Sequence, residues 1–244
     1  MRYGRFTALD GFSYAFEPGR LYGVIGPNGA GKTTLMNVLV GGTRSGTGSV
    51  FLGDDDVTRL GVAGRARRGL GRSFQVTKVF AGLTVFENLR LAAQAIELPG
   101  RQPLWRPARA MPRLVERARA MLATVGLERE AERPAEQLSH GDQRALELGL
   151  ALMTEPRVLL LDEPLAGIGH QALPAATELL ARVSQGRTIL LIEHNMSAVM
   201  RLADEVLVLA AGRLIASGAP DAVRRDPQVR EAYLGSDANL GSEA

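Results

Sequence analysis

The residues best suited to chemistry stand in one short stretch rich in glycine. The pattern G-x-x-x-x-G-K-[ST] is met by Gly26, Gly31, Lys32 and Thr33. Glycines let the backbone curl so that its N–H groups face phosphate oxygens, the lysine reaches the outer phosphates, and the hydroxyl can hold Mg²⁺. The sequence therefore predicts a phosphate-binding loop made of Gly26, Pro27, Asn28, Gly29, Ala30, Gly31, Lys32, Thr33 and Thr34.

Lysine is rare in this chain, and one of its two occurrences falls in this pattern. Of the 29 basic residues in the chain, Lys32 and Lys78 are the two lysines, and the others are all arginines. A compact ammonium, rather than a planar guanidinium fork, is wanted at the outer phosphates of a nucleotide. A Gly-rich surface turn explains this choice poorly, so we expect the protein to bind a nucleoside triphosphate.

A second group of reactive side chains comes directly after an apolar run. Residues 158–161 read as a buried strand that ends in the carboxylates of Asp162 and Glu163. The strands of a parallel sheet deliver the residues at their carboxyl ends to one edge, where the phosphate-binding loop also lies. There Asp162 can hold Mg²⁺, and Glu163 can orient and deprotonate an attacking water.

Alternating strands and helices have to position these residues. Apolar runs of strand length recur at residues 12–16, 21–25, 49–52, 157–161, 188–192, 205–209 and 213–216. Their alternation with helical segments predicts an α/β fold with a mixed sheet, largely parallel and covered by helices, in which the early strands are antiparallel.

Between residues 84 and 155 the pattern changes to helical spacing. One helix starts at Val85, a second contains Leu114, and a third runs from about residue 142 to 153. We therefore expect a single domain over 1–244. Its α/β core covers 1–83 and 156–235, its helical subdomain 84–155, and a disordered tail 236–244.

Composition restricts the possible functions. The chain has 244 residues, of which 45% are hydrophobic and 23% charged, as in an ordinary globular protein. With no cysteine, it has no disulfide, no thiol nucleophile and no thiolate metal site. It has no signal-peptide core and no apolar run near the roughly 18 residues that span a bilayer. We expect a cytoplasmic protein whose membrane contact runs through a partner.

The net charge of +3 raises the question of nucleic acid. The charges are spread along the chain and aromatic residues make up 5%, so we expect no nucleic-acid partner. For the densest basic cluster we expect a solvated helix face, with lipid head groups as the alternative ligand. This cluster consists of Arg59, Arg65, Arg67, Arg68 and Arg72.

A third motif carries a family resemblance. Residues 138–143, Leu-Ser-His-Gly-Asp-Gln, stand about twenty residues before Asp162 and resemble the signature loop of ABC transporter ATPases. A turn with Ser and Gly that opens a helix offers N–H donors and a hydroxyl to an anion. The resemblance implies that Ser139 and Gly141 act on the γ-phosphate of an ATP held by a second subunit. A simple N-cap by Ser139 fits the same residues equally well.

The same resemblance implies further site residues, with ATP and Mg²⁺ as the cofactors. Gln75 is similar to the residue that touches Mg²⁺ and senses the transmembrane partner. His194 resembles the switch histidine near the γ-phosphate. Tyr3 resembles the aromatic residue that stacks on adenine, and Phe6 is the nearby alternative.

The resemblance covers nearly the whole chain and is closest to importers of branched-chain amino acids and their relatives for urea and other amides. Residues 72–75, 82–88, 193–196 and 232–235 are similar to that branch. It implies an ATP-hydrolysing subunit at the cytoplasmic face of the inner membrane. Its partners would be transmembrane permease subunits, a second ATPase subunit and, indirectly, a periplasmic or extracellular solute-binding protein.

Two alternative functions stay open. The alternatives are a lipopolysaccharide-export ATPase and a soluble, non-transport ABC ATPase, a class that typically has two cassettes or a coiled-coil insertion.

The sequence departs from the family pattern in two places. The family usually has about ten residues before the position of Tyr3. Gly169 stands where many members carry an Asp that couples two nucleotide sites, while His140, in place of a second signature glycine, fits this branch.

Overall fold

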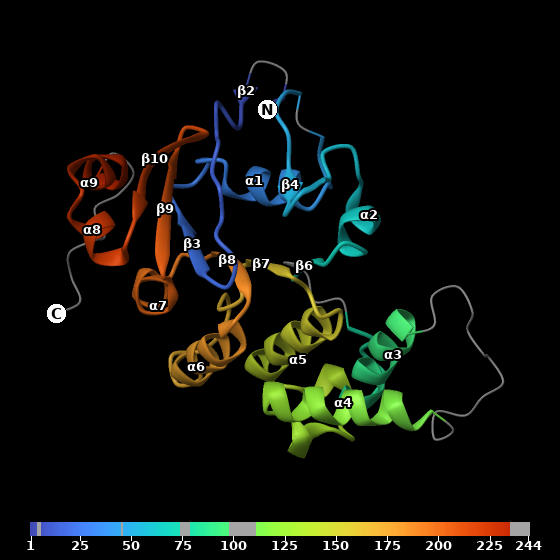
Figure 1. Ribbon diagram of the computed structural model, residues 1–244. Helices are drawn as coiled ribbons and strands as arrows, with labels where there is room; N and C mark the ends of the chain where they lie inside the picture. The colour runs from blue at the N-terminus through green and yellow to red at the C-terminus, as the bar shows by residue number, and fades with distance from the viewer. Residues whose placement is uncertain (4–5, 45, 74–78, 98–110, 235–244) are drawn as a thin grey trace.

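The architecture is a six-stranded sheet covered by helices on both faces (Figure 1). The computed structural model describes residues 1–244 except 4–5, 45, 74–78, 98–110 and 235–244. The strand order is β10-β9-β3-β8-β7-β6, and β10 is antiparallel to β9 while the other neighbours are parallel. The strands are β3 (Leu21–Ile25), β6 (Leu70–Arg72), β7 (Val158–Asp162), β8 (Thr188–Ile192), β9 (Glu205–Ala210) and β10 (Arg213–Gly218).

The two faces of this sheet bury two different apolar clusters. On β7, Leu159 and Leu161 pack with α5 (His140–Met153), α6 (Leu173–Ser184) and α7 (Met196–Leu202). Leu160 points the other way, into the cluster that contains α1 (Lys32–Leu39). Figure 1 shows α1 above the sheet and α5, α6 and α7 below it. Because side chains alternate along a strand, Asp162 belongs to the same face as Leu160, the face of α1.

Three helices form a group beside the sheet. They are α3 (Val85–Glu97), α4 (Pro112–Val125) and α5, and they share a separate apolar cluster around Leu89, Leu122 and Leu146. The three helices expected from the sequence are confirmed, although α5 begins at His140 because Ser139 caps it. The division of the chain at residues 84 and 155 stays a prediction. Short 3-10 turns at Glu128–Glu130 and Ala135–Gln137 join α4 to α5.

Residues 82–88 resemble the branched-chain amino acid importers, and part of this resemblance has a structural explanation. Thr84 and Glu87 form a capping box at the start of α3: the Glu87 N–H donates to Thr84 Oγ1 at 3.1 Å, and the Thr84 N–H donates to Glu87 Oε2 at 3.0 Å. The Asn88 amide lies 2% exposed and bonds both backbone groups of Phe80. These residues fix the entry into α3.

The strand predicted at 12–16 is wrong. Phe12, Tyr14 and Phe16 are half-buried and alternate with exposed residues, as in a strand, and Tyr14 and Phe16 pack against Tyr22. Alternation predicts an extended segment with one buried face, but a strand also needs a hydrogen-bonded neighbour. In the described part of the chain this segment joins no ladder.

The expectation that the early strands are antiparallel holds only for the run at 49–52, because 12–16 forms no strand within the residues described and β3 is parallel to both of its neighbours. Two short antiparallel pairs lie in this part of the chain. β1 (Arg2–Tyr3) pairs with β2 (Phe6–Thr7), and β4 (Phe51–Leu52) pairs with β5 (Asp55–Asp56). The run at 49–52 thus forms a strand over its last two residues. Two helices, α8 (Pro220–Arg225) and α9 (Pro227–Leu234), lie beside β10, and the tail 236–244 falls outside the described residues. None of the described helices is both long and apolar enough to cross a bilayer.

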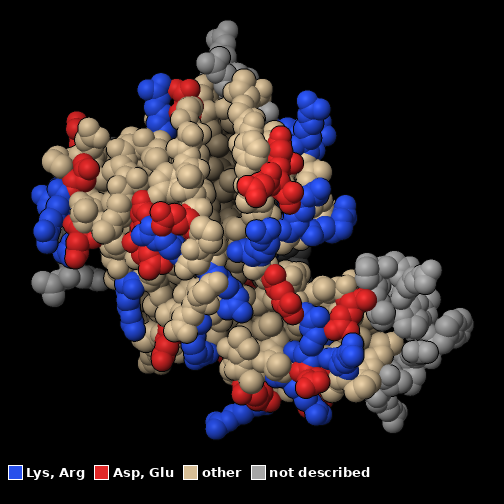
Figure 2. Space-filling model, viewed as in Figure 1, with Lys and Arg blue, Asp and Glu red and all other residues tan. Residues whose placement is uncertain are grey.

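The expectation of a solvated basic helix face is wrong for two of the five arginines in the cluster. Arg65, in α2 (Val62–Ala66), is 2% exposed, and its guanidinium donates to backbone carbonyls that include those of Val38 and Leu39 at the end of α1. Arg72 is turned toward Asp162. Arg59, Arg67 and Arg68 are exposed. Figure 2 shows basic and acidic side chains interspersed on the face it presents.

Candidate functional site

The glycine-rich loop predicted to bind phosphate connects the end of β3 to the start of α1. Gly26, Gly29 and Gly31 have φ of 149°, 78° and 102°, a region that favours glycine. Packing adds a second requirement, because a Cβ on Gly26 would lie 2.1 Å from the Leu209 carbonyl oxygen. The Gly212 N–H also donates to Ala30 O at 3.0 Å. The loop is therefore held in its curled form by β9 and the turn after it.

Lys32 opens α1 and reaches back over the loop. Its Nζ donates to the carbonyl oxygens of Gly26 and Pro27, the latter at 3.0 Å. Burial lowers the pKa of this ammonium, and the negative charges of Glu163 and Asp162 oppose that shift. The lysine is thus electrostatically coupled to both carboxylates at the end of β7.

Asp162 ends β7 on the α1 face and is 1% exposed. Its Oδ2 accepts a hydrogen bond from Arg72 Nη2 at 3.1 Å, whereas its Oδ1 is buried without a hydrogen-bond partner in the described part of the chain. Burial raises the pKa of this carboxyl, and Arg72 opposes the shift. A free carboxylate oxygen beside a phosphate-binding loop fits a hard cation such as Mg²⁺. Thr33, exposed in the first turn of α1, offers a hydroxyl as another ligand.

Glu163 and His194 meet at the edge of the sheet. The Glu163 backbone N–H donates to Ile192 O at 2.9 Å, and His194 Nε2 lies 2.8 Å from Glu163 Oε1. Glu163 has φ of 52°, a left-handed conformation that costs a non-glycine residue on the order of 1 kcal/mol. Such strain is typical of functional positions, where it fixes the direction of a side chain. In the sequence these two residues stand after separate apolar runs, and the structure brings them into contact.

Sequence reasoning missed three residues of this site. Glu193 is 4% exposed and accepts hydrogen bonds from the Leu165 N–H at 2.6 Å and the His194 N–H at 3.1 Å. Burial raises the pKa of its carboxyl, and these backbone donors oppose the shift. Glu193 therefore ties the loop after Glu163 to the loop that carries His194.

The other two missed residues are Arg72 and Asn37. Arg72 Nη1 donates to Asn37 Oδ1 at 2.7 Å, so one guanidinium bridges α1 and Asp162. The sequence did contain a signal for Arg72, because it is a charged residue in the short strand β6 of a mostly apolar sheet. Asn37 gave no signal, since an Asn within a helix is ordinary.

Ser139 and Gly141 lie at the start of α5. Ser139 is its N-cap: Oγ accepts from the Asp142 N–H at 3.2 Å and donates to Asp142 Oδ2 at 2.7 Å. A Cβ on Gly141 would meet nothing closer than 3.8 Å. The N-cap interpretation thus holds for Ser139 within the chain, while packing in the described residues does not explain why position 141 is glycine.

Two predicted site residues cannot be placed. Gln75 lies outside the described residues. Tyr3 belongs to β1 and pairs with Phe6, but the side chains of both lie outside what the structure describes. Gly169 is exposed, and its carbonyl accepts from the Leu173 N–H at 3.1 Å at the start of α6.

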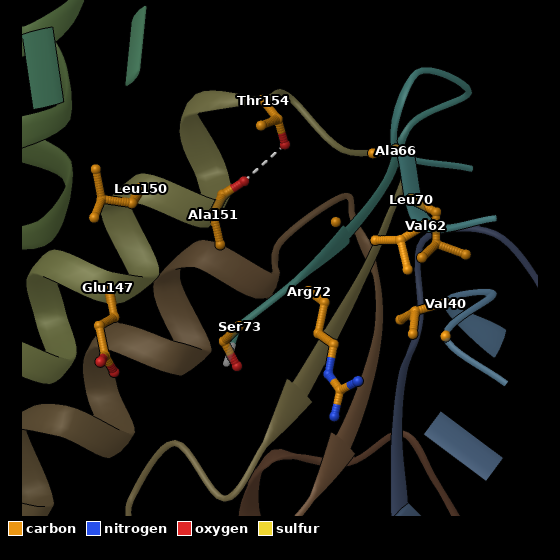
Figure 3. A pocket seen from close by; sticks show the side chains of 12 residues that line it. Val40, Val62, Ala66, Leu70, Arg72, Ser73, Glu147, Leu150, Ala151 and Thr154 are labelled. Atoms are coloured by element: carbon orange, nitrogen blue, oxygen red, sulfur yellow. Dashed lines mark hydrogen bonds between the residues drawn. The ribbon is translucent and has the colours of Figure 1, made fainter. Parts of the chain in front are cut away.

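A groove of about 340 Å³ lies between α2, β6 and α5 (Figure 3). Its lining is mostly apolar, with Val40, Val62 and Leu150 among its members. Glu147 also lines it. The Glu147 side chain is 9% exposed; its Oε2 accepts from Arg144 Nη1 at 2.8 Å, and its Oε1 is buried with no partner in the part described.

Comparison with known proteins decides the family. The model of the ABC transporter family matches residues 9–166, which include the phosphate-binding loop, the signature-like loop, Asp162 and Glu163. The chain belongs to the ABC transporter ATP-binding family. A second model, for the branched-chain amino acid ATP-binding cassette transporter, matches residues 213–239. As a member of this family the cassette binds ATP, and the family implies ATPase activity.

Individual relatives agree over nearly the whole length of the cassette. It is 37% identical over 243 residues to the high-affinity branched-chain amino acid transport ATP-binding protein LivG of Escherichia coli (strain K12), covering 96% of this chain and 94% of LivG. The ADP conformation of MJ1267, an ATP-binding cassette of an ABC transporter, superimposes with a TM-score of 0.83 at 33% identity, covering 96% of this chain and 95% of that one. The family and the fold class expected from the sequence are confirmed.

Proposed function

We propose that this cassette is the ATP-hydrolysing subunit of a membrane importer for branched-chain amino acids or related small amino acids and amides, urea included. The observation that carries the proposal is the contact of 2.8 Å between Glu163 and His194, at the sheet edge that the phosphate-binding loop and Asp162 share. The match of its C-terminal segment to the branched-chain amino acid cassette model supports the substrate class.

Each residue of the site then has a role in hydrolysis. Lys32 and the N–H groups of the loop bind the phosphates and stabilise the charge that develops on them. Glu163 orients the attacking water and takes its proton, while His194, hydrogen-bonded to Glu163, holds that carboxylate in place. Mg²⁺, when bound, would neutralise phosphate charge, and Thr33, Asp162 and Gln75 would hold it.

A second ATPase subunit completes the site. Two cassettes face each other around two ATP molecules, and Ser139 and Gly141 of each act on the ATP of the other. Within the described residues nothing packs closely enough to demand glycine at 141, which supports a close approach by something outside the chain. ATP bridges the pair, and its hydrolysis separates them. Tyr3 would stack on the adenine.

Permease subunits would contact the cassette at the groove beside β6. Arg72 and Ser73, which directly precede the segment that contains Gln75, are among the residues that line the groove between α2, β6 and α5. Its mostly apolar walls suit a segment of a transmembrane subunit. The cassette then sits at the cytoplasmic face of the inner membrane, held by permease subunits. The solute-binding protein acts on it indirectly, through the permease.

Lipopolysaccharide export is the second candidate. The cassette is 30% identical to the lipopolysaccharide export system ATP-binding protein LptB of Escherichia coli (strain K12) over 233 residues, which is less than its identity to LivG. The soluble, non-transport class has no observation in its favour here. The importer is therefore the function we propose.

Pull-down of the tagged cassette from native membranes, with mass spectrometry of the proteins that come with it, tests the assignment. Two different permease subunits together with a second, similar ATPase support the amino-acid importer. Components of lipopolysaccharide export, or ribosomes and DNA without any permease, contradict it.

A further inference from the structure

One guanidinium connects the metal-binding edge of the sheet to α1. Arg72 donates through Nη2 to Asp162 Oδ2 at 3.1 Å and through Nη1 to Asn37 Oδ1 at 2.7 Å. Its side chain is 16% exposed and that of Asp162 is fully buried. A buried ion pair of this kind is costly to make and costly to break, so it constrains both partners strongly.

The register of the sheet places Arg72 there. β6 runs parallel to β7 with Arg72 opposite Leu160, and Leu160 belongs to the apolar cluster on the α1 face. Leu70, two residues earlier in β6, packs into the same cluster. Because alternate residues of a strand share a face, Arg72 is directed to the side where Asp162 and Asn37 lie.

The two oxygens of the Asp162 carboxylate have different surroundings. Arg72 occupies Oδ2, whereas Oδ1 is buried without a partner in the described residues. A carboxylate held at one oxygen by a charge-assisted hydrogen bond from an arginine cannot rotate freely, and it presents its other oxygen in one direction. Groups that orient a metal ligand in this way tune the affinity of the metal site.

We propose that Arg72 is a positioning residue, which fixes the Asp162 carboxylate so that Oδ1 faces the Mg²⁺ of the nucleotide complex. Asn37 sets the plane of the guanidinium. The inference rests on the proposed function, since it takes Asp162 as a ligand of that cation. It goes further by assigning the ion pair between β6 and β7 to metal binding and not to the stability of the sheet alone.

The position of Arg72 also connects the cation site to the groove. Arg72 and Ser73 line the groove between α2, β6 and α5 (Figure 3), and Ser73 Oγ accepts from the Asp162 N–H at 3.4 Å. The two residues that bond to Asp162 are therefore among those that an occupant of the groove would contact. A permease segment seated there would bear on the orientation of Asp162 through β6.

The test measures metal and nucleotide separately in the full chain. Arg72→Met removes the charge and both hydrogen bonds at similar length, Arg72→Lys keeps the charge, and Asn37→Ala removes the second anchor without touching Asp162. For each, the affinity for a fluorescent ATP analogue is measured in EDTA, and Mn²⁺ binding to the nucleotide complex is titrated by electron paramagnetic resonance.

We expect Arg72→Met to bind the analogue in EDTA within about twofold of the wild type and to bind Mn²⁺ about 10- to 100-fold more weakly. Arg72→Lys should lie between, and Asn37→Ala should shift Mn²⁺ affinity in the same direction by less. Mn²⁺ affinity equal to the wild type in Arg72→Met overturns the inference, as does an equal loss of metal-free nucleotide binding. If Arg72→Met does not fold, Asn37→Ala decides by the same criteria. A wild type that binds no nucleotide would instead refute the proposed function.

Discussion

At the scale of single residues, the site depends on side chains held by strain and burial. Glu163 sits in a left-handed conformation at the end of β7, and its Oε1 lies 2.8 Å from His194 Nε2. The Glu193 carboxylate accepts hydrogen bonds from the backbone N–H groups of Leu165 and His194. The direction of the Glu163 side chain is therefore set by its backbone, by His194 and by the loop that Glu193 ties down.

The role of His194 gives the first prediction. His194→Ala leaves Glu163 without its partner at Oε1, so the carboxylate is no longer held over the attacking water. We expect ATP turnover to fall by about 100-fold or more, because positioned general bases contribute that much. ATP affinity should change little, since His194 does not belong to the loop that binds the phosphates. Steady-state hydrolysis and nucleotide binding measured on one preparation check this, and unchanged turnover contradicts the role.

At the scale of elements, α5 contains two glycines with opposite surroundings. Gly149 packs where α3, α4 and α5 meet, and a Cβ there would lie 3.2 Å from Val125 Cγ1 and 3.3 Å from Leu89 Cδ2. At Gly141, in the first turn of the same helix, a Cβ would make only ordinary van der Waals contacts, the nearest with Ala172 Cβ at 3.8 Å. A glycine in a helix costs about 0.5 to 1 kcal/mol relative to alanine, so Gly141 requires a reason beyond the folded chain.

The pair of glycines gives the second prediction. Gly141→Ala should raise the free energy of unfolding of the isolated subunit by about 0.5 kcal/mol and lower its ATPase activity, because the added methyl group obstructs the facing subunit. Gly149→Ala is the matched control and should lower stability by about 1 kcal/mol through overpacking. Denaturant unfolding and ATPase assays measure both effects. Full activity in Gly141→Ala would remove the argument for a contact between subunits.

The elements also show what the sequence could and could not predict. β3 and β8 have the bounds that their apolar runs predicted, since a strand buried on both faces is a continuous apolar run. The segment 12–16 was misassigned because alternation reports burial and not a pairing partner. The bridge from Asn37 through Arg72 to Asp162 joins residues up to 125 positions apart along the chain, and it depends on which strands are neighbours. A single sequence predicts the strands but not that order.

At the scale of the whole molecule, the groove is the feature that a partner would recognise. Glu147 leaves its Oε1 buried and unpaired, within the described residues, in a mostly apolar groove. An unsatisfied buried acceptor costs about 1 to 3 kcal/mol, and a donor from a partner would recover that cost. We therefore expect that a permease segment, if it docks in this groove as proposed, carries a cationic or other hydrogen-bond-donating side chain.

Assembly gives the third prediction. Glu147→Gln keeps the shape of the side chain and removes its charge, so less permease should co-purify with the cassette while the ATPase activity of the isolated subunit stays the same. Glu178→Gln, an exposed carboxylate on α6, is the matched control and should leave co-purification unchanged. Equal recovery of permease with both variants would show that Glu147 takes no part in docking.

A comparison of two proteins tests whether this cassette hydrolyses ATP with Glu163 as the base. Purified wild type and Glu163→Gln are measured side by side for ATP affinity and for phosphate release in the presence of Mg²⁺. We expect the variant to bind ATP as the wild type does, to release almost no phosphate, and to accumulate as an ATP-bound dimer. Phosphate release at the wild-type rate by Glu163→Gln would contradict the role of Glu163 as the base.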